Sequence, residues 1–92
     1  MGLKHYVVAI PSYKRPDTLK KRTLKLLQNY NIEPRRIYIF VSDNSQKKMY
    51  EKEIPEHSYH KIVVGKPGIK NIRNFMSQYF PEGQYIFYID DD

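Results

Sequence analysis

The sequence predicts an α/β fold built on a parallel sheet. Short apolar runs rich in β-branched and aromatic residues alternate with helical patterns along the 92-residue chain. This alternation is typical of parallel strands that are joined by helical crossovers. Three of the runs are almost continuously apolar, as expected of strands buried on both faces of a sheet. We therefore expect a Rossmann-like β-α-β-α-β-α-β order in a single domain over residues 1–92.

The apolar runs define the expected strands. They are His5 to Ile10, Arg36 to Val41, Lys61 to Val64 and Gln84 to Ile89. By analogy with doubly wound folds, we expect the spatial order 3-2-1-4. In such sheets ligands bind beyond the carboxyl ends of the strands, near the point where the strand order reverses.

The first helix is expected to follow the first strand. Pro16 suits the first helical position, and Asp17 suits the first turn because a carboxylate complements the helix dipole there. Asn31 suits the C-terminal stop of this helix. The apolar stripe on the helix is expected to consist of Leu19, Leu24, Leu26, Leu27 and Tyr30.

Two further helices are expected between the remaining strands. One runs from Gln46 to Glu53 and is closed by Pro55, and the other opens after Pro67-Gly68 and ends at Pro81-Glu82-Gly83. Apolar residues recur at helical spacing along the last one, namely Ile69, Ile72, Phe75, Met76, Tyr79 and Phe80.

The composition excludes several classes of protein. The chain has no cysteine, which excludes a disulfide scaffold and thiolate zinc or iron–sulfur sites. No apolar run approaches the roughly 20 residues needed to cross a bilayer, and the start lacks the apolar core of a signal peptide. We therefore expect a cytoplasmic protein without a membrane span. The net charge of +6 fits either solvated helix faces or attraction to polyanions such as nucleotide phosphates or nucleic acid.

Three carboxylates follow the last apolar run: Asp90, Asp91 and Asp92. Like charges this close repel one another unless a cation shares the site, and Mg²⁺ and Mn²⁺ favour carboxylate oxygen. In an extended chain Asp90 and Asp92 point to the same side, so this D-x-D pair can hold a metal ion against a diphosphate. The alternative is a solvated acidic strand end.

Other polar residues are expected at the same edge of the sheet. Tyr13 could stack on a base and Arg15 could reach a phosphate, although the segment from Pro11 is equally suited to a solvent-facing turn. Asp43 could accept a ribose hydroxyl or a base N–H, or it could simply cap a helix. Arg73 could clamp an anion, or it could belong to the polar face of an ordinary amphipathic helix. The chain contains neither G-x-x-x-x-G-K-[ST] nor G-x-G-x-x-G, so those phosphate-binding loops are excluded.

Four motifs, in series, resemble the nucleotide-binding half of family 2 GT-A glycosyltransferases. The first is Pro-Ser-Tyr-Lys-Arg-Pro at 11–16, and the second is Val-Ser-Asp-Asn-Ser at 41–45. The third is Gly-Ile-Lys-Asn-Ile-Arg-Asn at 68–74, and the fourth is Tyr-Ile-Asp-Asp-Asp at 88–92. The chain departs from the family pattern at Ser42, which replaces the commoner acid, and at Ile72, which replaces the usual alanine.

The resemblance implies the binding of a nucleotide-sugar, most often a UDP-sugar, and transfer of its sugar to an acceptor hydroxyl. It implies a nucleotide site formed by Pro11, Tyr13, Arg15, Asp43, Arg73, Asp90 and Asp91. It further implies that Asp90 and Asp92 hold a Mn²⁺ or Mg²⁺ ion that stabilises the leaving nucleoside diphosphate. Family members have a second half that supplies the acceptor site, so we expect this chain to be a truncated portion, not competent for transfer alone.

A narrower resemblance is to glycosyltransferases of phages and large viruses that modify DNA bases. It implies modified DNA as the acceptor and the host cytoplasm as the location, and the positive charge fits such an acceptor. Two other functions stay open. One is a sugar-phosphate nucleotidyltransferase, which shares a related fold and holds phosphates through a metal. The other is a basic nucleic-acid-binding module without enzymatic activity.

Overall fold

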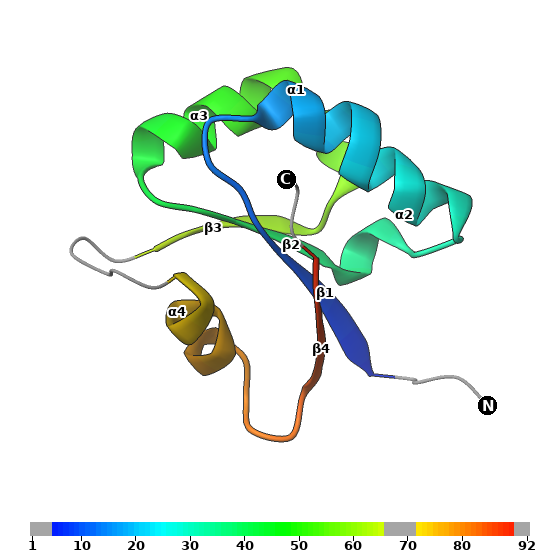
Figure 1. Cartoon of the computed structure of the whole chain (residues 1–92), viewed down its shortest axis with the longest axis vertical. Coiled ribbons are helices and arrows are strands. Elements are labelled where there is room, and N and C mark those ends of the chain that lie inside the picture. The colour runs from blue at the N-terminus through cyan, green and yellow to red at the C-terminus, as the bar shows by residue number, and fades with distance from the viewer. Residues whose placement is uncertain (1–4, 66–71, 90–92) are drawn as a thin grey trace.

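The computed structural model describes residues 5–65 and 72–89, which form an all-parallel sheet flanked by helices (Figure 1). The strands are β1 (Tyr6–Pro11), β2 (Ile37–Val41), β3 (Lys61–Val64) and β4 (Tyr85–Tyr88). Their spatial order is β3-β2-β1-β4, and every neighbouring pair is parallel. The predicted α/β, Rossmann-like class and the predicted strand order are both confirmed.

The helices lie on both faces of the sheet. The segments α1 (Pro16–Thr18), η1 (Leu19–Leu24) and α2 (Lys25–Asn29) follow one another without a break, and α3 (Asn44–Glu53) lies beside α1. Figure 1 shows these helices on one side of the sheet and α4 (Ile72–Tyr79) on the other. Right-handed crossovers explain this arrangement, because the chain steps from β1 to β3 in one direction and then returns across the sheet to β4.

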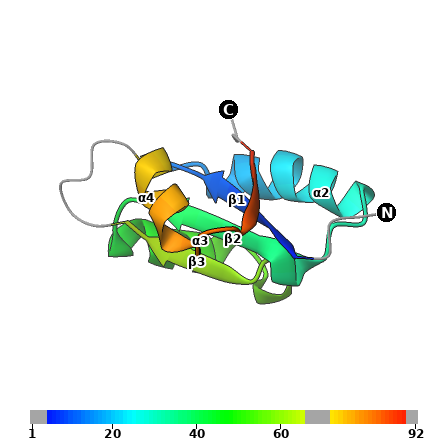
Figure 2. The same ribbon diagram turned by 90° about the horizontal axis from the view of Figure 1, so that it is seen from below.

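Two apolar cores, one on each face of the sheet, hold these layers together. Alternate residues of a strand point to opposite faces, so β1 places Val8 and Ile10 in one core and Ala9 in the other. The core under α1, η1, α2 and α3 is completed by Leu19, Leu24, Leu27, Ile37, Ile39, Val41, Tyr50, Ile54 and Ile62. In Figure 2, α4 lies in front of the sheet. The core under α4 is completed by Phe40, Val63, Met76 and Phe80. β1 and β2 are therefore buried on both faces, as predicted.

The apolar stripe predicted for the first helix is wrong in part. Leu24 and Leu27 are buried, but Leu26 is 50% exposed and Tyr30 is 72% exposed. The reason is that Leu19–Leu24 forms a π-helical turn. Its i→i+5 hydrogen bonds widen the turn, so each residue advances by less than the 100° of an ideal α-helix. The face that meets the sheet is therefore shifted, and Leu26 and Tyr30 turn toward solvent.

The expectation that the last strand is buried on both faces is also wrong. β4 lies at the edge of the described sheet and pairs with β1 alone. Tyr85 is 60% exposed, Phe87 is 48% exposed and Tyr88 is 41% exposed. The helices α1 to α3 follow the crossovers from β1 to β3, so they leave the β4 side of their face uncovered. Among the aromatic pairs of the described residues, Phe87 contacts only Tyr6 of β1, edge to face, with the ring centroids 5.3 Å apart.

The other helix boundaries that fall on described residues differ little from the predictions, whereas the predicted start of the last helix after Pro67-Gly68, with Ile69, lies outside the described residues. Asn31 ends the first helix in the left-handed conformation with φ 60°, which suits a C-terminal stop. α3 starts at Asn44, two residues before the predicted start, because Asp43 caps it. In the described ranges, no helix is long and apolar enough to cross a membrane.

Candidate functional site

The strand order reverses at β1, so the switch point lies between the carboxyl ends of β1 and β4. At β1, the chain leaves the sheet at Pro11 and enters the loop that leads to α1. At β4, the backbone N–H of Ile89 donates to the carbonyl of Ala9 at 3.1 Å. The chain therefore follows β1 as far as Ile89, the residue before the three acids. This edge is where a parallel sheet of this kind binds ligands.

The loop after β1 is fastened to α3 through two buried side chains. The hydroxyl of Tyr50, a fully buried residue, lies 2.5 Å from the Ser12 hydroxyl and accepts from the Arg15 backbone N–H at 3.0 Å. The side-chain carbonyl of Gln46, one helical turn earlier, accepts from the Lys14 backbone N–H at 2.9 Å. The Ser12 N–H is itself held by the carbonyl of Phe40 in β2 at 2.9 Å. Residues 12–15 thus have a fixed backbone.

This fastening holds a loop conformation that is unfavourable by itself. Lys14 has φ 52°, in the left-handed region that costs a side-chain-bearing residue about 1–2 kcal/mol. The two hydrogen bonds to the N–H groups of Lys14 and Arg15 offset that cost. As a result, the side chain of Tyr13 is 60% exposed, with the Lys14 ammonium 5.2 Å from its ring centroid. An exposed ring suits stacking on a base through the face that the ammonium does not cover.

The segment after β2 is tied to the same loop. The Gln46 side chain, which accepts from Lys14, also donates through its amide nitrogen to the Ser42 hydroxyl. Asp43 caps α3, since its Oδ1 accepts from the Gln46 backbone N–H at 2.9 Å and from the Ser45 hydroxyl at 2.7 Å. These hydrogen bonds, that of Ser45 foremost, lower the pKa of the Asp43 carboxyl from its ordinary value. Asp43 is therefore a carboxylate at neutral pH.

Four of the residues predicted for the nucleotide site lie on this edge. Pro11 ends β1, Tyr13 and Arg15 are exposed in the loop after it, and Asp43 is exposed at the start of α3. The structure therefore brings the first two sequence motifs together through Gln46. Asp43 has the helix-capping role that was the alternative interpretation, and its contact with a base stays a prediction.

The other predicted site residues are not placed. Asp90, Asp91 and Asp92 lie outside the described residues, and so does the side chain of Arg73, whose backbone belongs to α4. Within residues 5–65 and 72–89, no group of three or more acidic, histidine or cysteine side chains could hold a metal ion. The predicted metal ligands are not among those residues, so the metal site stays a prediction.

Sequence reasoning missed Gln46 and Tyr50. Their spacing by four residues places them on one face of the helix, and this was the available signal. A polar and an aromatic residue on one helix face do not reveal which loop that face meets, because the contact joins residues more than 30 positions apart.

No family model, curated protein or solved structure matches the chain significantly. A functional assignment therefore depends on the residues of the site and on their motifs.

Proposed function

We propose that this chain binds a nucleotide-sugar, with UDP as the nucleotide, together with Mn²⁺ or Mg²⁺. It would do so as the donor-binding part of a glycosyltransferase that moves a sugar to an acceptor hydroxyl. One observation carries the proposal: a loop with a fixed backbone presents Tyr13 and Arg15 at the switch point of the sheet. The sequence of the strand beside it continues into three acids. The motif resemblance supports the same function.

The residues of this edge suit the parts of such a donor. The exposed ring of Tyr13 offers a stacking surface for a base, and the Arg15 guanidinium suits a phosphate. The Asp43 carboxylate suits a base N–H or a ribose hydroxyl as acceptor. Asp90 and Asp92 supply the carboxylate oxygens that hard divalent cations prefer. A cation held there would supply positive charge to stabilise the leaving nucleoside diphosphate.

Calorimetry with UDP tests the proposal. We expect UDP to bind in the presence of MnCl₂ and to lose binding when the metal is chelated. Asp90→Ala/Asp92→Ala should abolish the metal-dependent binding, because the carboxylates would be the metal ligands. Glu53→Ala/Glu82→Ala, which removes two exposed acids outside this edge, is the charge-matched control and should bind as the wild type does. UDP affinity that survives chelation, or Asp90→Ala/Asp92→Ala, would refute the proposal.

Two further assays separate the other functions. Release of pyrophosphate from a nucleoside triphosphate and a sugar phosphate would indicate a nucleotidyltransferase. DNA binding that falls steeply with salt and is indifferent to Asp90→Ala/Asp92→Ala would indicate a nucleic-acid-binding module. Neither result is expected for a nucleotide-sugar site that depends on a metal.

A further inference from the structure

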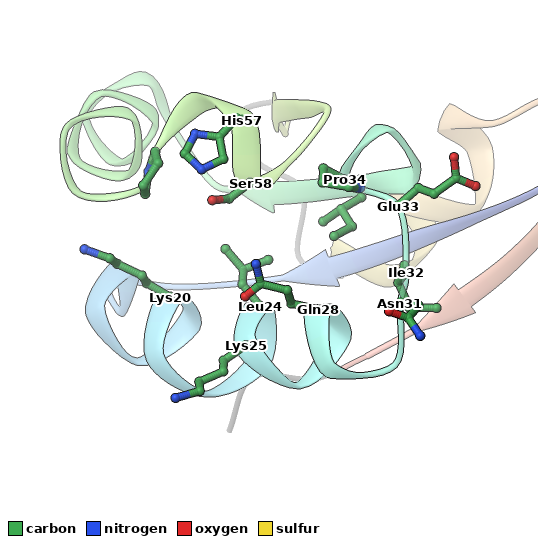
Figure 3. Close-up of a pocket in the computed structure, with 12 residues that line it drawn as sticks. Lys20, Leu24, Lys25, Gln28, Asn31, Ile32, Glu33, Pro34, His57 and Ser58 are labelled. Atoms are coloured by element: carbon green, nitrogen blue, oxygen red, sulfur yellow. The ribbon is translucent and has the colours of Figure 1, made fainter.

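A cleft of about 660 Å³ lies between the η1–α2 helix and the segments that precede β2 and β3 (Figure 3). Its walls include Pro34, of the turn η2 (Pro34–Arg36) that leads into β2, and Ser58, of the turn η3 (Glu56–Ser58) that precedes β3. The cleft therefore opens at the amino ends of these strands. The candidate nucleotide site lies at the carboxyl ends, so the two are at opposite edges of the sheet.

The floor of the cleft is apolar and its rim is polar. Leu24 projects from the helix toward the gap in Figure 3 and is 7% exposed, and Ile37 at the start of β2 is 3% exposed. Ile32, Pro34 and Pro55 continue the apolar lining. The rim is formed by Lys20, Lys25, Gln28, Asn31, His57 and Ser58. A cleft of about 300–1,000 Å³ with an apolar floor and a few polar groups is typical of small-molecule sites.

The charge of the lining is positive. Lys20 and Lys25 both line the cleft, and the acid among the lining residues, Glu33, is already paired. Its carboxylate accepts from the Arg35 Nε at 2.7 Å and from the Arg36 Nε at 3.2 Å. Figure 3 shows this carboxylate directed away from the gap. Among the described residues that line the cleft, the two lysines therefore have no compensating acid.

We propose that this cleft binds an organic anion with an apolar body, such as an aryl phosphate. The apolar body would cover Leu24 and Ile37, and the anionic group would lie at the rim beside Lys20. The Lys25 ammonium extends away from the gap in Figure 3, so it would add attraction only at longer range. This site is independent of the proposed nucleotide function, because it shares no residue with the switch-point edge. Gln28 and Ser58 supply further hydrogen-bond donors at the rim.

Phenyl phosphate is a suitable probe, with backbone amide shifts of the isotope-labelled protein as the readout. In about 0.15 M salt, where exposed charges are screened beyond about 8 Å, we expect saturable shifts at the amides of Leu24, Gln28 and Ser58. Inorganic phosphate lacks the apolar body and benzyl alcohol lacks the charge, so each should bind more weakly than phenyl phosphate. Shifts that are equal for all three probes, or that do not saturate, would overturn the proposal.

A pair of charge reversals tests the role of the rim. Lys20→Glu/Lys25→Glu should weaken phenyl phosphate binding by at least about fivefold. Arg22→Glu/Lys48→Glu makes the same change in net charge at exposed residues that do not line the cleft, so it should weaken binding by less than about twofold. Circular dichroism should show both variants folded, because all four side chains are exposed. An equal loss in the two variants would mean general attraction by a basic surface and would overturn the proposal.

Discussion

Two side chains of α3, Gln46 and Tyr50, determine the shape of the loop that presents Tyr13 and Arg15. Both are buried, at 2% and 0% exposure. The polar atoms of both side chains form hydrogen bonds with that loop or with its neighbour Ser42. Buried polar groups are stable only when hydrogen-bonded, so the network is a structural necessity as well as a means of fixing the loop. At the scale of single residues, Tyr50 therefore belongs to the core and also holds the loop of the candidate site.

Tyr50→Phe tests this link. The substitution removes the hydroxyl that joins Ser12 and the Arg15 N–H, so we expect a loss of about 1–3 kcal/mol in the free energy of unfolding. Urea unfolding measures the loss. Tyr30→Phe is the control, because Tyr30 is 72% exposed and a surface change of this kind stays within about 0.5 kcal/mol. Equal stability of the two variants would contradict the assignment of the hydroxyl as a buried link.

At the scale of elements, the strands and helices could be predicted because their patterns are local. Apolar runs marked all four strands of the described sheet to within one residue at each end, and Pro16, Asn31 and Pro55 marked helix ends. The π-helical turn could not be predicted, because the sequence of 19–24 has no distinctive signal for it. The exposure of β4 was missed for a similar reason: an apolar run does not reveal whether a helix covers it.

The adjacent residues Leu26 and Leu27 report on the π-helical turn. In an uninterrupted α-helix both leucines would belong to the apolar stripe, whereas here Leu27 is 5% exposed and Leu26 is 50% exposed. We expect Leu27→Ala to cost about 2–5 kcal/mol, through lost burial and a cavity, and Leu26→Ala to cost under about 1 kcal/mol. Urea unfolding of the two single variants measures the difference. Comparable losses would show that the helix has no shifted face.

The same limit applies to the candidate site. The sequence indicated the residues at the carboxyl edge because parallel strands bring their ends together, and four of them are found there. It did not indicate the contacts that fix them, since these join α3 to a loop distant in the chain. The cleft at the opposite edge was missed because its walls come from separate segments that are joined only by folding.

At the scale of the whole molecule, one sheet serves two cores. β1 and β2 each contribute side chains to both faces, and β1 also pairs with β4. Loss of either core would therefore remove support from the same central strands. This coupling implies that both faces unfold in a single transition, as small single domains usually do, although among the described residues the core under α4 has fewer buried members than the other.

Met76→Ala tests whether the smaller core is part of that single transition. Met76 is fully buried under α4, so the substitution should cost about 2–5 kcal/mol. Circular dichroism follows all helices, while tyrosine fluorescence is available because the chain has nine tyrosines and no tryptophan. We expect the urea midpoints from the two probes to coincide in the wild type and to fall together in Met76→Ala. A variant in which one probe changes well before the other would show that the two cores do not unfold in a single transition.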